Sequence, residues 1–92
     1  MIFIEYENKL INLSLCSEIR KIKKTKYYAI EYFASAVFET LYSNENKEFI
    51  DKVYNELLEN IKLAVKSNNT AYQRLMYIDL NNIVESIKNW SI

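Results

Sequence analysis

The segment from residue 44 to residue 67 constrains the fold most, because its apolar face is too broad to leave in water. Apolar residues recur there at steps of three and four, the spacing of one side of an α-helix, and this row consists of Ile50, Val53, Leu57, Ile61 and Ala64, widened by Phe49, Tyr54, Leu58 and Val65. The opposite side is polar and charged. The pattern predicts a long helix from Glu45 to Lys66 that packs against the rest of the chain.

Residues that favour helix ends border this segment. Asn44 and Asn46 can cap the first turn, and the negative charge of Glu48 suits the positive end of a helix dipole. Lys66 lies in the last turn, and asparagines follow at 68 and 69, where the left-handed conformation that ends a helix is needed. These signals agree with the periodicity.

Missing residue types exclude several kinds of chemistry. The 92 residues contain no glycine, which excludes the P-loop and the dinucleotide-binding turn because both need close approach of the backbone to phosphate. Without histidine, and with Cys16 as the single cysteine, one chain can form neither a structural zinc site, nor a histidine-based triad, nor an internal disulfide. We expect a non-enzymatic protein with no cofactor and no metal.

Length and composition predict one globular domain, residues 1–92. Half of the residues are hydrophobic, and twelve basic residues balance twelve acidic ones. No uncharged apolar run approaches the roughly 20 residues that span a bilayer, and the apolar start is too short for a secretory signal. We therefore expect a soluble, cytoplasmic protein. Its abundance of Asn, Ile, Lys and Tyr indicates an AT-rich genome, such as that of a low-GC bacterium or its phage.

The first 16 residues favour a β-hairpin. Residues 1–6 alternate in polarity as a strand does, and the polar run that follows, Glu7 to Lys9, suits a turn in which Asn8 takes the positive φ that glycine usually supplies. A second strand is predicted from Leu10, with Ile11, Leu13 and Leu15 on one face and Asn12, Ser14 and Cys16 on the other.

The segment Tyr28 to Tyr42 fits two interpretations. Its many aromatic and β-branched residues favour two strands joined near Ser35, whereas the lack of Gly, Asn or Asp at that turn favours a helix. Because three or four strands form a more stable sheet than an isolated hairpin does, we expect strands.

The C-terminal part is predicted to end in a short helix, Asp79 to Asn89. Asp79 is a suitable N-cap, and Leu80, Ile83, Val84, Ile87 and Trp90 follow at helical spacing. Residues 71–77 fit either a strand or the first turns of a helix. The predicted class is α+β: an antiparallel meander of three or four strands from Met1 to Tyr42, covered by the two helices. The alternative is a mostly α fold with an N-terminal hairpin.

A basic run is the strongest candidate binding site. Lysines on a hairpin tip can neutralise phosphates, and neighbouring tyrosines can stack on bases, so the candidate residues are Arg20, Lys21, Lys23, Lys24, Lys26, Tyr27, Tyr28 and Tyr32. The run also fits contact with an acidic protein surface, or a solvated turn that protects a sheet edge from aggregation. The neutral charge of the whole chain argues against a dedicated nucleic-acid domain.

The eight tyrosines suggest a protein-binding surface, because tyrosine offers rigid area with a polar tip. We expect a small protein-binding module, such as a phage or mobile-element inhibitor of a host protein complex, anti-CRISPR-like in type by analogy of size and composition. The alternative is a nucleic-acid-binding accessory protein that uses residues 20–26. A homodimer formed through an exposed apolar face of the terminal helix is compatible with either function. No membrane partner is expected.

Two acidic pairs and the cysteine are further candidates for chemistry. Glu5 with Glu7, and Glu56 with Glu59, could act as acid and base or hold a hard cation, but no motif supports either pair, and Glu56 and Glu59 are expected on a solvated surface away from any pocket. Cys16 is expected to be a small buried apolar residue.

Overall fold

The computed structural model describes residues 1–68 and 76–90, without the side chains of residues 68 and 90, and has an α+β fold. Its elements in chain order are β1 (Ile2–Tyr6), β2 (Lys9–Asn12), a 3-10 helix η1 (Leu13–Leu15), β3 (Glu18–Lys23), β4 (Tyr28–Ala34), β5 (Val37–Asn44), α1 (Lys47–Asn68), β6 (Met76–Asp79) and α2 (Leu80–Trp90). The α+β class is therefore confirmed.

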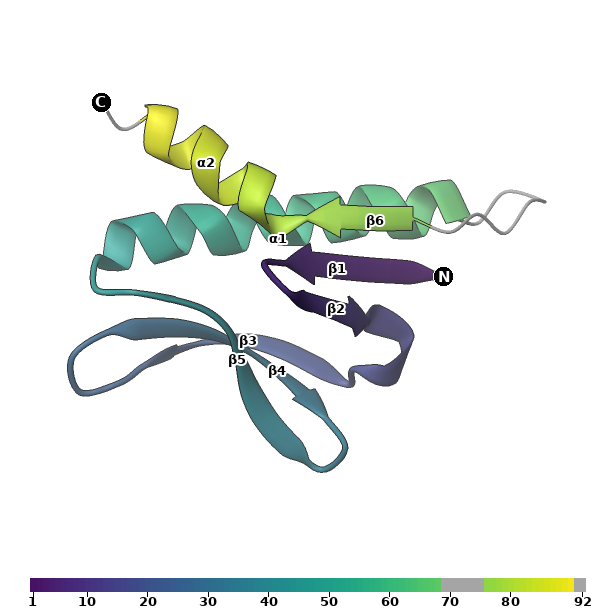
Figure 1. Cartoon of the computed structure of the whole chain (residues 1–92), viewed down its shortest axis with the longest axis horizontal. Helices are drawn as coiled ribbons and strands as arrows, with labels where there is room; N and C mark the ends of the chain where they lie inside the picture. Colours follow the sequence, from purple (N-terminus) through teal and green to yellow (C-terminus); the bar gives the residue numbers. More distant parts are fainter. Residues whose placement is uncertain (69–75, 91–92) are drawn as a thin grey trace.

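The strands form two three-stranded sheets (Figure 1). The first sheet has the order β2-β1-β6, in which β2 is antiparallel and β6 parallel to β1. The second sheet is the antiparallel meander β3-β4-β5. The expected single meander is thus divided into two sheets, because β1 pairs with β2 and with the distant β6, and β2 does not pair with β3.

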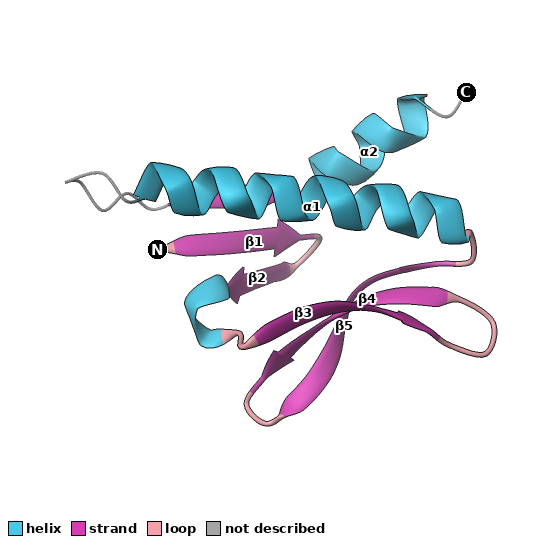
Figure 2. Ribbon diagram, turned by 180° about the vertical axis from the view of Figure 1, so that it is seen from behind, coloured by secondary structure: helices cyan, strands magenta, loops and turns pink. Residues whose placement is uncertain are grey.

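Helix α1 supplies the core that both sheets share. Figure 1 shows β6 in front of this helix with β1 beside β6, and Figure 2, from behind, shows the helix in front of β6. The predicted stripe faces inward, with Ile50, Val53, Leu57 and Ala64 buried and Ile61 half-buried. Val65, predicted at the margin of this face, is instead exposed. Buried residues of both sheets and α2 complete one cluster, namely Ile2, Ile4, Ile11, Ile30, Tyr32, Leu41, Tyr42, Ile78, Leu80, Ile83 and Val84.

Both helix starts are capped by side chains. The backbone N–H of Phe49 donates to Asn46 Oδ1 at 3.1 Å, and that of Asn82 donates to Asp79 Oδ1 at 3.1 Å. Each carboxamide or carboxylate satisfies a first-turn donor that has no partner within the helix. The predicted cap at Asp79 is confirmed. The predicted terminal stripe is buried at Leu80, Ile83 and Val84, and the side chain of Trp90 lies outside the described part.

The predicted second strand is shorter than expected. It ends at Asn12, whose Oδ1 accepts hydrogen bonds from the backbone N–H of Ser14 at 3.0 Å and from its hydroxyl at 2.7 Å. This side chain competes with the strand ladder and starts the 3-10 helix Leu13–Leu15. The expected alternation through Cys16 is therefore wrong beyond Asn12.

Both tight hairpins take positive φ without glycine. The β4–β5 loop consists of Ser35 (φ 55°) and Ala36 (φ 67°), and positive φ at both loop residues suits the twist of the adjoining strands. The strand interpretation of residues 28–42 is thus confirmed although the usual turn residues are missing. In the β1–β2 loop the positive φ belongs to Glu7 (φ 52°), so its prediction for Asn8 is wrong.

Candidate binding surfaces

The basic run is mostly strand and only partly hairpin tip. Arg20, Lys21 and Lys23 belong to β3, whereas Lys24 and Lys26 lie in the connection to β4. Because successive strand residues point to opposite faces, Arg20 lies on the face away from α1 and Lys21 on the face toward it. The five cations therefore do not form one surface.

Arg20 and Lys24 enclose a carboxylate on the outer face of the second sheet. Arg20 stands opposite Glu31 in the β3–β4 register, and its Nε and Nη2 donate to Glu31 Oε1 at 3.1 and 2.9 Å. Lys24 Nζ lies 3.2 Å from Glu31 Oε2. Glu31 is only 5% exposed. Burial tends to raise its pKa, but the hydrogen bonds and charges of the two cations outweigh burial and lower it.

Aromatic rings complete this outer-face cluster. The guanidinium carbon of Arg20 lies 3.5 Å from the centroid of the Phe38 ring, which is within cation–π range. Phe38 packs against Phe33 with 4.8 Å between ring centroids. One arginine thus neutralises a carboxylate and covers an aromatic ring at the same time, so its charge is used within the protein.

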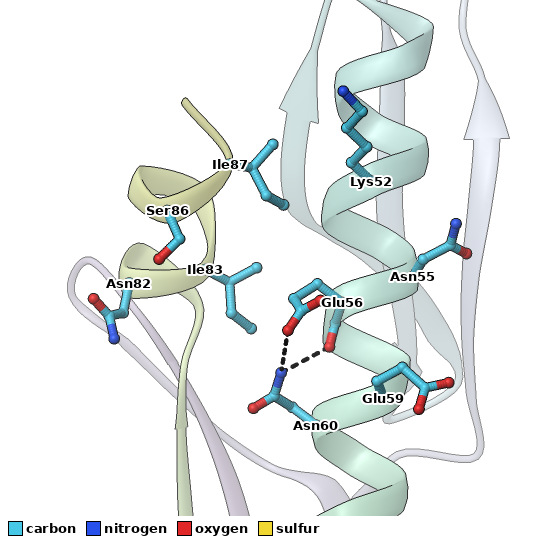
Figure 3. Close-up of a pocket in the computed structure, with 9 residues that line it drawn as sticks. All are labelled: Lys52, Asn55, Glu56, Glu59, Asn60, Asn82, Ile83, Ser86 and Ile87. Atoms are coloured by element: carbon cyan, nitrogen blue, oxygen red, sulfur yellow. Dashed lines mark hydrogen bonds between the residues drawn. The ribbon is translucent and has the colours of Figure 1, made fainter. Parts of the chain in front are cut away.

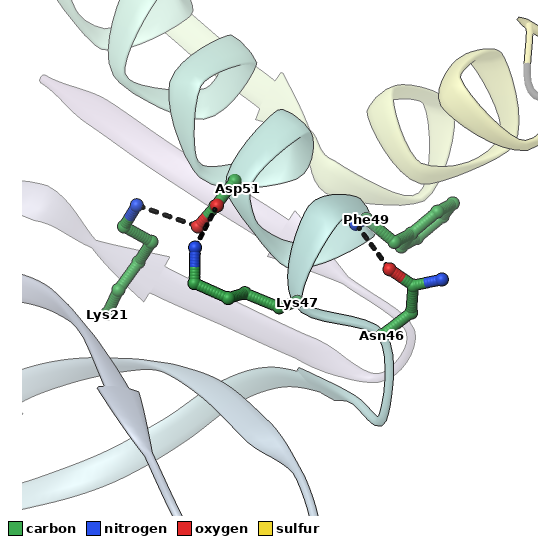
Figure 4. Close-up of polar contacts among 5 residues, drawn as sticks. All are labelled: Lys21, Asn46, Lys47, Phe49 and Asp51. Atoms are coloured by element: carbon green, nitrogen blue, oxygen red, sulfur yellow. Dashed lines mark hydrogen bonds and ion pairs between the residues drawn. The ribbon is translucent and has the colours of Figure 1, made fainter.

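Lys21 joins the second sheet to the start of α1 (Figure 4). Its Nζ lies 2.8 Å from Asp51 Oδ1, while Lys47 Nζ lies 3.1 Å from Asp51 Oδ2. Hydrogen bonds from Lys21 and Lys47 lower the pKa of Asp51. The Tyr54 hydroxyl donates to the carbonyl of Ile19 at 3.2 Å and ties the same strand to the helix. These contacts give Lys21 a structural role.

Two exposed lysines of the predicted site lack an ion pair in the described residues, and one of its tyrosines is exposed. Lys23, Lys26 and Tyr27 are exposed, and neither lysine forms an ion pair within residues 1–68 and 76–90. Tyr28 is half-buried. Tyr32 is buried, and its hydroxyl donates to Glu39 Oε2 at 2.7 Å. That hydrogen bond, together with burial, raises the pKa of Tyr32 to about 12.

Most of the described tyrosines belong to the core or its margin. Tyr32 and Tyr42 are buried, and the half-buried ones are Tyr6, Tyr28 and Tyr54. Only Tyr27 and Tyr77 are exposed among the tyrosines in the described residues, and Tyr72 lies outside them. The predicted tyrosine-rich surface is thus limited to these two side chains. Tyr27 lies in the β3–β4 connection and Tyr77 in β6 of the first sheet.

Tyr77 is an exposed residue of β6, on the outer face of the first sheet. Figure 1 shows that α1 lies against the other face of this sheet. Ile2, Ile4, Ile11 and Ile78 point toward the core, so the alternate residues point outward. We call this outer surface the open face, and it consists of Phe3, Glu5, Leu10, Asn12, Tyr77 and Asp79. Phe3 stacks on Tyr77 with 5.6 Å between centroids and 20° between planes. Leu10 is 57% and Tyr77 55% exposed.

The charges of the open face are all negative. Glu5 and Asp79 are direct partners in the parallel β1–β6 register, and neither forms an ion pair within the described chain. Asp79 accepts the backbone N–H of Asn82 as a helix cap. Lys9, the basic residue of β2, directs its Nζ to the carbonyl of Thr40 in β5 at 3.1 Å. An apolar and anionic surface results.

A groove of about 670 Å³ separates α1 from α2 (Figure 3). Glu56 and Glu59 line it, so their predicted position away from any pocket is wrong, because α2 packs beside that side of α1. Asn60 Nδ2 donates to the carbonyl of Glu56 at 2.8 Å. Lys62 Nζ lies 3.5 Å from Glu59 Oε1. Ile83 and Ile87 form the apolar part of the lining. Figure 3 shows the Glu56 and Glu59 side chains pointing away from each other.

Cys16 is half-buried, which is less burial than the sequence predicted. Its Sγ lies 3.5 Å from the carbonyl of Asn12, and burial raises the pKa of the thiol. A raised pKa disfavours the thiolate, which is the nucleophilic form. Glu5 and Glu7, the other acidic pair from the sequence, lie in β1 and its hairpin turn.

Comparisons with protein-family models, with curated proteins and with solved structures found no match to this chain. None of the helices in the described segments is long and apolar enough to cross a membrane. In residues 1–68 and 76–90, no group of three or more Cys, Asp or Glu side chains is arranged to hold a metal ion. The shape, charge and exposed side chains of the surfaces described above are therefore what indicates a function.

Proposed function

We propose that this protein is a non-enzymatic binding module that engages a protein partner through the open face. One observation carries the proposal: an uncovered sheet face presents a stacked aromatic pair, Phe3 and Tyr77, beside the exposed Leu10. Contiguous apolar surface of this kind favours association, and tyrosine is enriched at the centres of interfaces. The open face has this character on a hydrogen-bonded sheet, and a preorganised surface loses less entropy on binding.

The charge of the open face favours a protein over a nucleic acid as its ligand. Glu5 and Asp79 are its ionised groups, and their charge repels a phosphate backbone. We further propose that the module inhibits a host protein complex and is encoded by a phage or other mobile element. The small size of the chain, its lack of glycine and histidine, and its AT-rich composition support this finer proposal.

Affinity capture from a lysate of the native cell, followed by cross-linking mass spectrometry, tests the binding proposal. The bait proteins are the wild type, Tyr77→Ala, and Tyr27→Ala as the matched control at the other exposed tyrosine. We expect a partner at near-equal stoichiometry, cross-linked next to the open face, that Tyr77→Ala loses at least tenfold and Tyr27→Ala retains. A partner retained equally by both variants, or no partner, would contradict the proposal.

A nucleic-acid-binding function through the β3–β4 connection is the second candidate. Lys23, Lys26 and Tyr27 are exposed near one another in sequence, and both lysines lack ion pairs in the described parts of the chain. Two phosphate contacts give a shallow dependence on salt, with a slope near −2 in a log–log plot. Loss of oligonucleotide binding in Lys23→Ala/Lys26→Ala, with this slope in the wild type, would support it. Salt-independent binding would exclude it.

A further inference from the structure

We infer that the open face recognises a cationic protein segment, in which an arginine covers the Phe3–Tyr77 pair and forms ion pairs with Glu5 and Asp79. The inference rests on the proposed function and specifies the chemistry of its partner. Three properties of the described residues carry it: the juxtaposition of two carboxylates, the aromatic pair in the next row, and a matching arrangement elsewhere in the same protein.

The first property is an uncompensated pair of like charges. Glu5 and Asp79 are direct neighbours across β1 and β6, and like charges in such positions destabilise a sheet. No described cation neutralises them, since Lys9 reaches toward Thr40 of the second sheet. A cation supplied by a partner removes the repulsion and gains an attraction, so the open face is complementary to positive charge.

The second property is the row of aromatic rings beside these carboxylates. Phe3 and Tyr77 precede Glu5 and Asp79 by two residues in their strands, so all four side chains lie on the same face in adjacent rows. Arginine suits this arrangement better than lysine, because its planar guanidinium stacks on a ring while its N–H groups pair with carboxylates. The exposed Leu10 extends the face for an apolar side chain of the partner.

The third property is an intramolecular counterpart on the second sheet. There a carboxylate, Glu31, lies in the row next to the aromatic pair Phe33 and Phe38. Arg20 stacks on Phe38 and binds Glu31. The open face has the same combination of rings and carboxylates, but its own chain supplies no arginine among the described residues. An arginine of the partner would form on the first sheet the contacts that Arg20 forms on the second: stacking on an aromatic ring and pairing with a carboxylate.

A second copy of this chain in a symmetric dimer is a poorer occupant of the open face than a cationic segment. A symmetric dimer through this face would bring in two further carboxylates and no cation from the open face of the second copy to pair with them. A symmetric dimer is therefore an alternative outcome that sedimentation can detect.

Nuclear magnetic resonance titration with defined peptides tests the inference. The probes are acetylated and amidated Leu-Arg-Trp-Arg-Leu, its lysine counterpart and its glutamate counterpart. In Glu5→Gln/Asp79→Asn the face is neutral, yet the cap of α2 is kept because asparagine caps helices as well as aspartate does. Glu56→Gln/Glu59→Gln is the control, since it removes the same number of charges from the α1–α2 groove.

We expect the arginine peptide to shift the amide signals of residues 3–5, 10 and 77–79 and to bind more tightly than the lysine peptide. Neutralising the open face should weaken this binding about tenfold, the effect of two exposed ion pairs of roughly 0.7 kcal/mol each. The groove control should bind as the wild type does, and the glutamate peptide should not bind. Shifts centred elsewhere, equal binding by the neutral variant, or a symmetric dimer through this face would overturn the inference.

The partner-capture experiment separates failure of this inference from failure of the proposed function. If Tyr77→Ala loses the captured partner while Glu5→Gln/Asp79→Asn retains it in full, the open face binds protein without cation recognition, so the inference alone fails. If neither variant reduces capture, the proposed function fails with it. If Tyr77→Ala and Glu5→Gln/Asp79→Asn both lose the captured partner while Glu56→Gln/Glu59→Gln retains it, the proposed function and the inference are both supported.

Discussion

The outer faces of the two sheets carry the same kinds of side chain, aromatic rings and carboxylates in adjacent rows, but they treat the carboxylates differently. On the second sheet Glu31 is buried beneath Arg20 and Lys24. On the first sheet Glu5 and Asp79 are exposed side by side and lack a cation in the described part of the chain. On the second sheet the carboxylate is neutralised within the protein, whereas the open face of the first sheet is complementary to a positively charged ligand.

Chain connectivity accounts for part of this difference. Arg20 and Glu31 face each other across a local hairpin and form their ion pair without help from distant segments. Glu5 and Asp79 lie near opposite ends of the chain and meet only because β6 adds to β1 in parallel. A charge pair formed by local pairing contributes to folding, whereas the one created by the last strand opposes it slightly. Such a cost is understandable where the site serves binding.

Helix α1 links the two sheets, so the largest expected effect comes from its centre. Leu57 is fully buried in the cluster that both sheets share. Leu57→Ala removes apolar contacts and leaves a cavity, and should lower the free energy of unfolding by about 2–5 kcal/mol. Hydrogen exchange should show that β1 and β4 lose protection together. Loss of protection in one sheet alone would mean that the two sheets unfold independently.

The two kinds of carboxylate should differ in their effect on stability. Glu31→Ala leaves Arg20 and Lys24 without their shared partner and should lower the free energy of unfolding by about 1–2 kcal/mol. The low end applies because both cations are about one-third exposed, so water screens the interaction. Glu5→Ala should change stability by at most about 0.5 kcal/mol, and in the favourable direction because it relieves repulsion from Asp79.

Urea denaturation of both variants at neutral pH measures this contrast. Arg20→Met is a useful companion, because it keeps apolar cover over Phe38 but removes one cation from Glu31. Its loss of stability should be similar to that of Glu31→Ala. Equal losses in Glu31→Ala and Glu5→Ala would mean that pairing on the second sheet contributes nothing beyond side-chain packing.

Acid should weaken the ion pairs that Arg20 and Lys24 form with Glu31 on the second sheet. Since the pKa of Glu31 is lower in the folded protein than the usual 4.5, the unfolded state binds its proton more readily. The stabilisation from Glu31 is therefore complete above pH 4.5 and is lost as the pH falls through the lower folded pKa. In Glu31→Gln this part of the pH dependence should disappear, as chemical denaturation between pH 3 and pH 6 can measure. If the free energy of unfolding of Glu31→Gln depends on pH as that of the wild type does, the pH dependence comes from other carboxylates.

Local patterns predicted the elements of this fold better than their pairing. The apolar stripe from Ile50 to Ala64 and the cap at Asp79 follow from residues near one another in sequence, and both are confirmed. The pairing of β6 with β1 depends on contacts between distant segments, which no local pattern encodes. Met76–Asp79 lay in or beside a stretch that fitted strand and helix equally, so the parallel strand was missed.

The candidate site was predictable only in part for the same reason. The basic run was visible as a sequence block, but its ion pairs with Glu31 and Asp51 depend on strand register and on the docking of α1. The open face has no contiguous signal, because Phe3 and Tyr77 come from opposite ends of the chain. Alternation along residues 1–6 correctly placed Phe3 and Glu5 on one face of the strand. Their neighbours Tyr77 and Asp79 could not be predicted from this local pattern.

The two hairpins allow a last and smaller test of the comparison between sheets. Ser35 and Ala36 both adopt positive φ, which is unfavourable for residues with a Cβ atom, whereas the β1–β2 loop has this conformation only at Glu7. Replacement by Asn-Gly, the preferred pair for such a loop, should raise the free energy of unfolding by about 1 kcal/mol. Glu7→Gly should raise it by less, because one residue is relieved and the unfolded chain gains freedom. Thermal denaturation of Ser35→Asn/Ala36→Gly and Glu7→Gly compares them, and a larger gain at Glu7 would place more backbone strain in the first sheet than in the second.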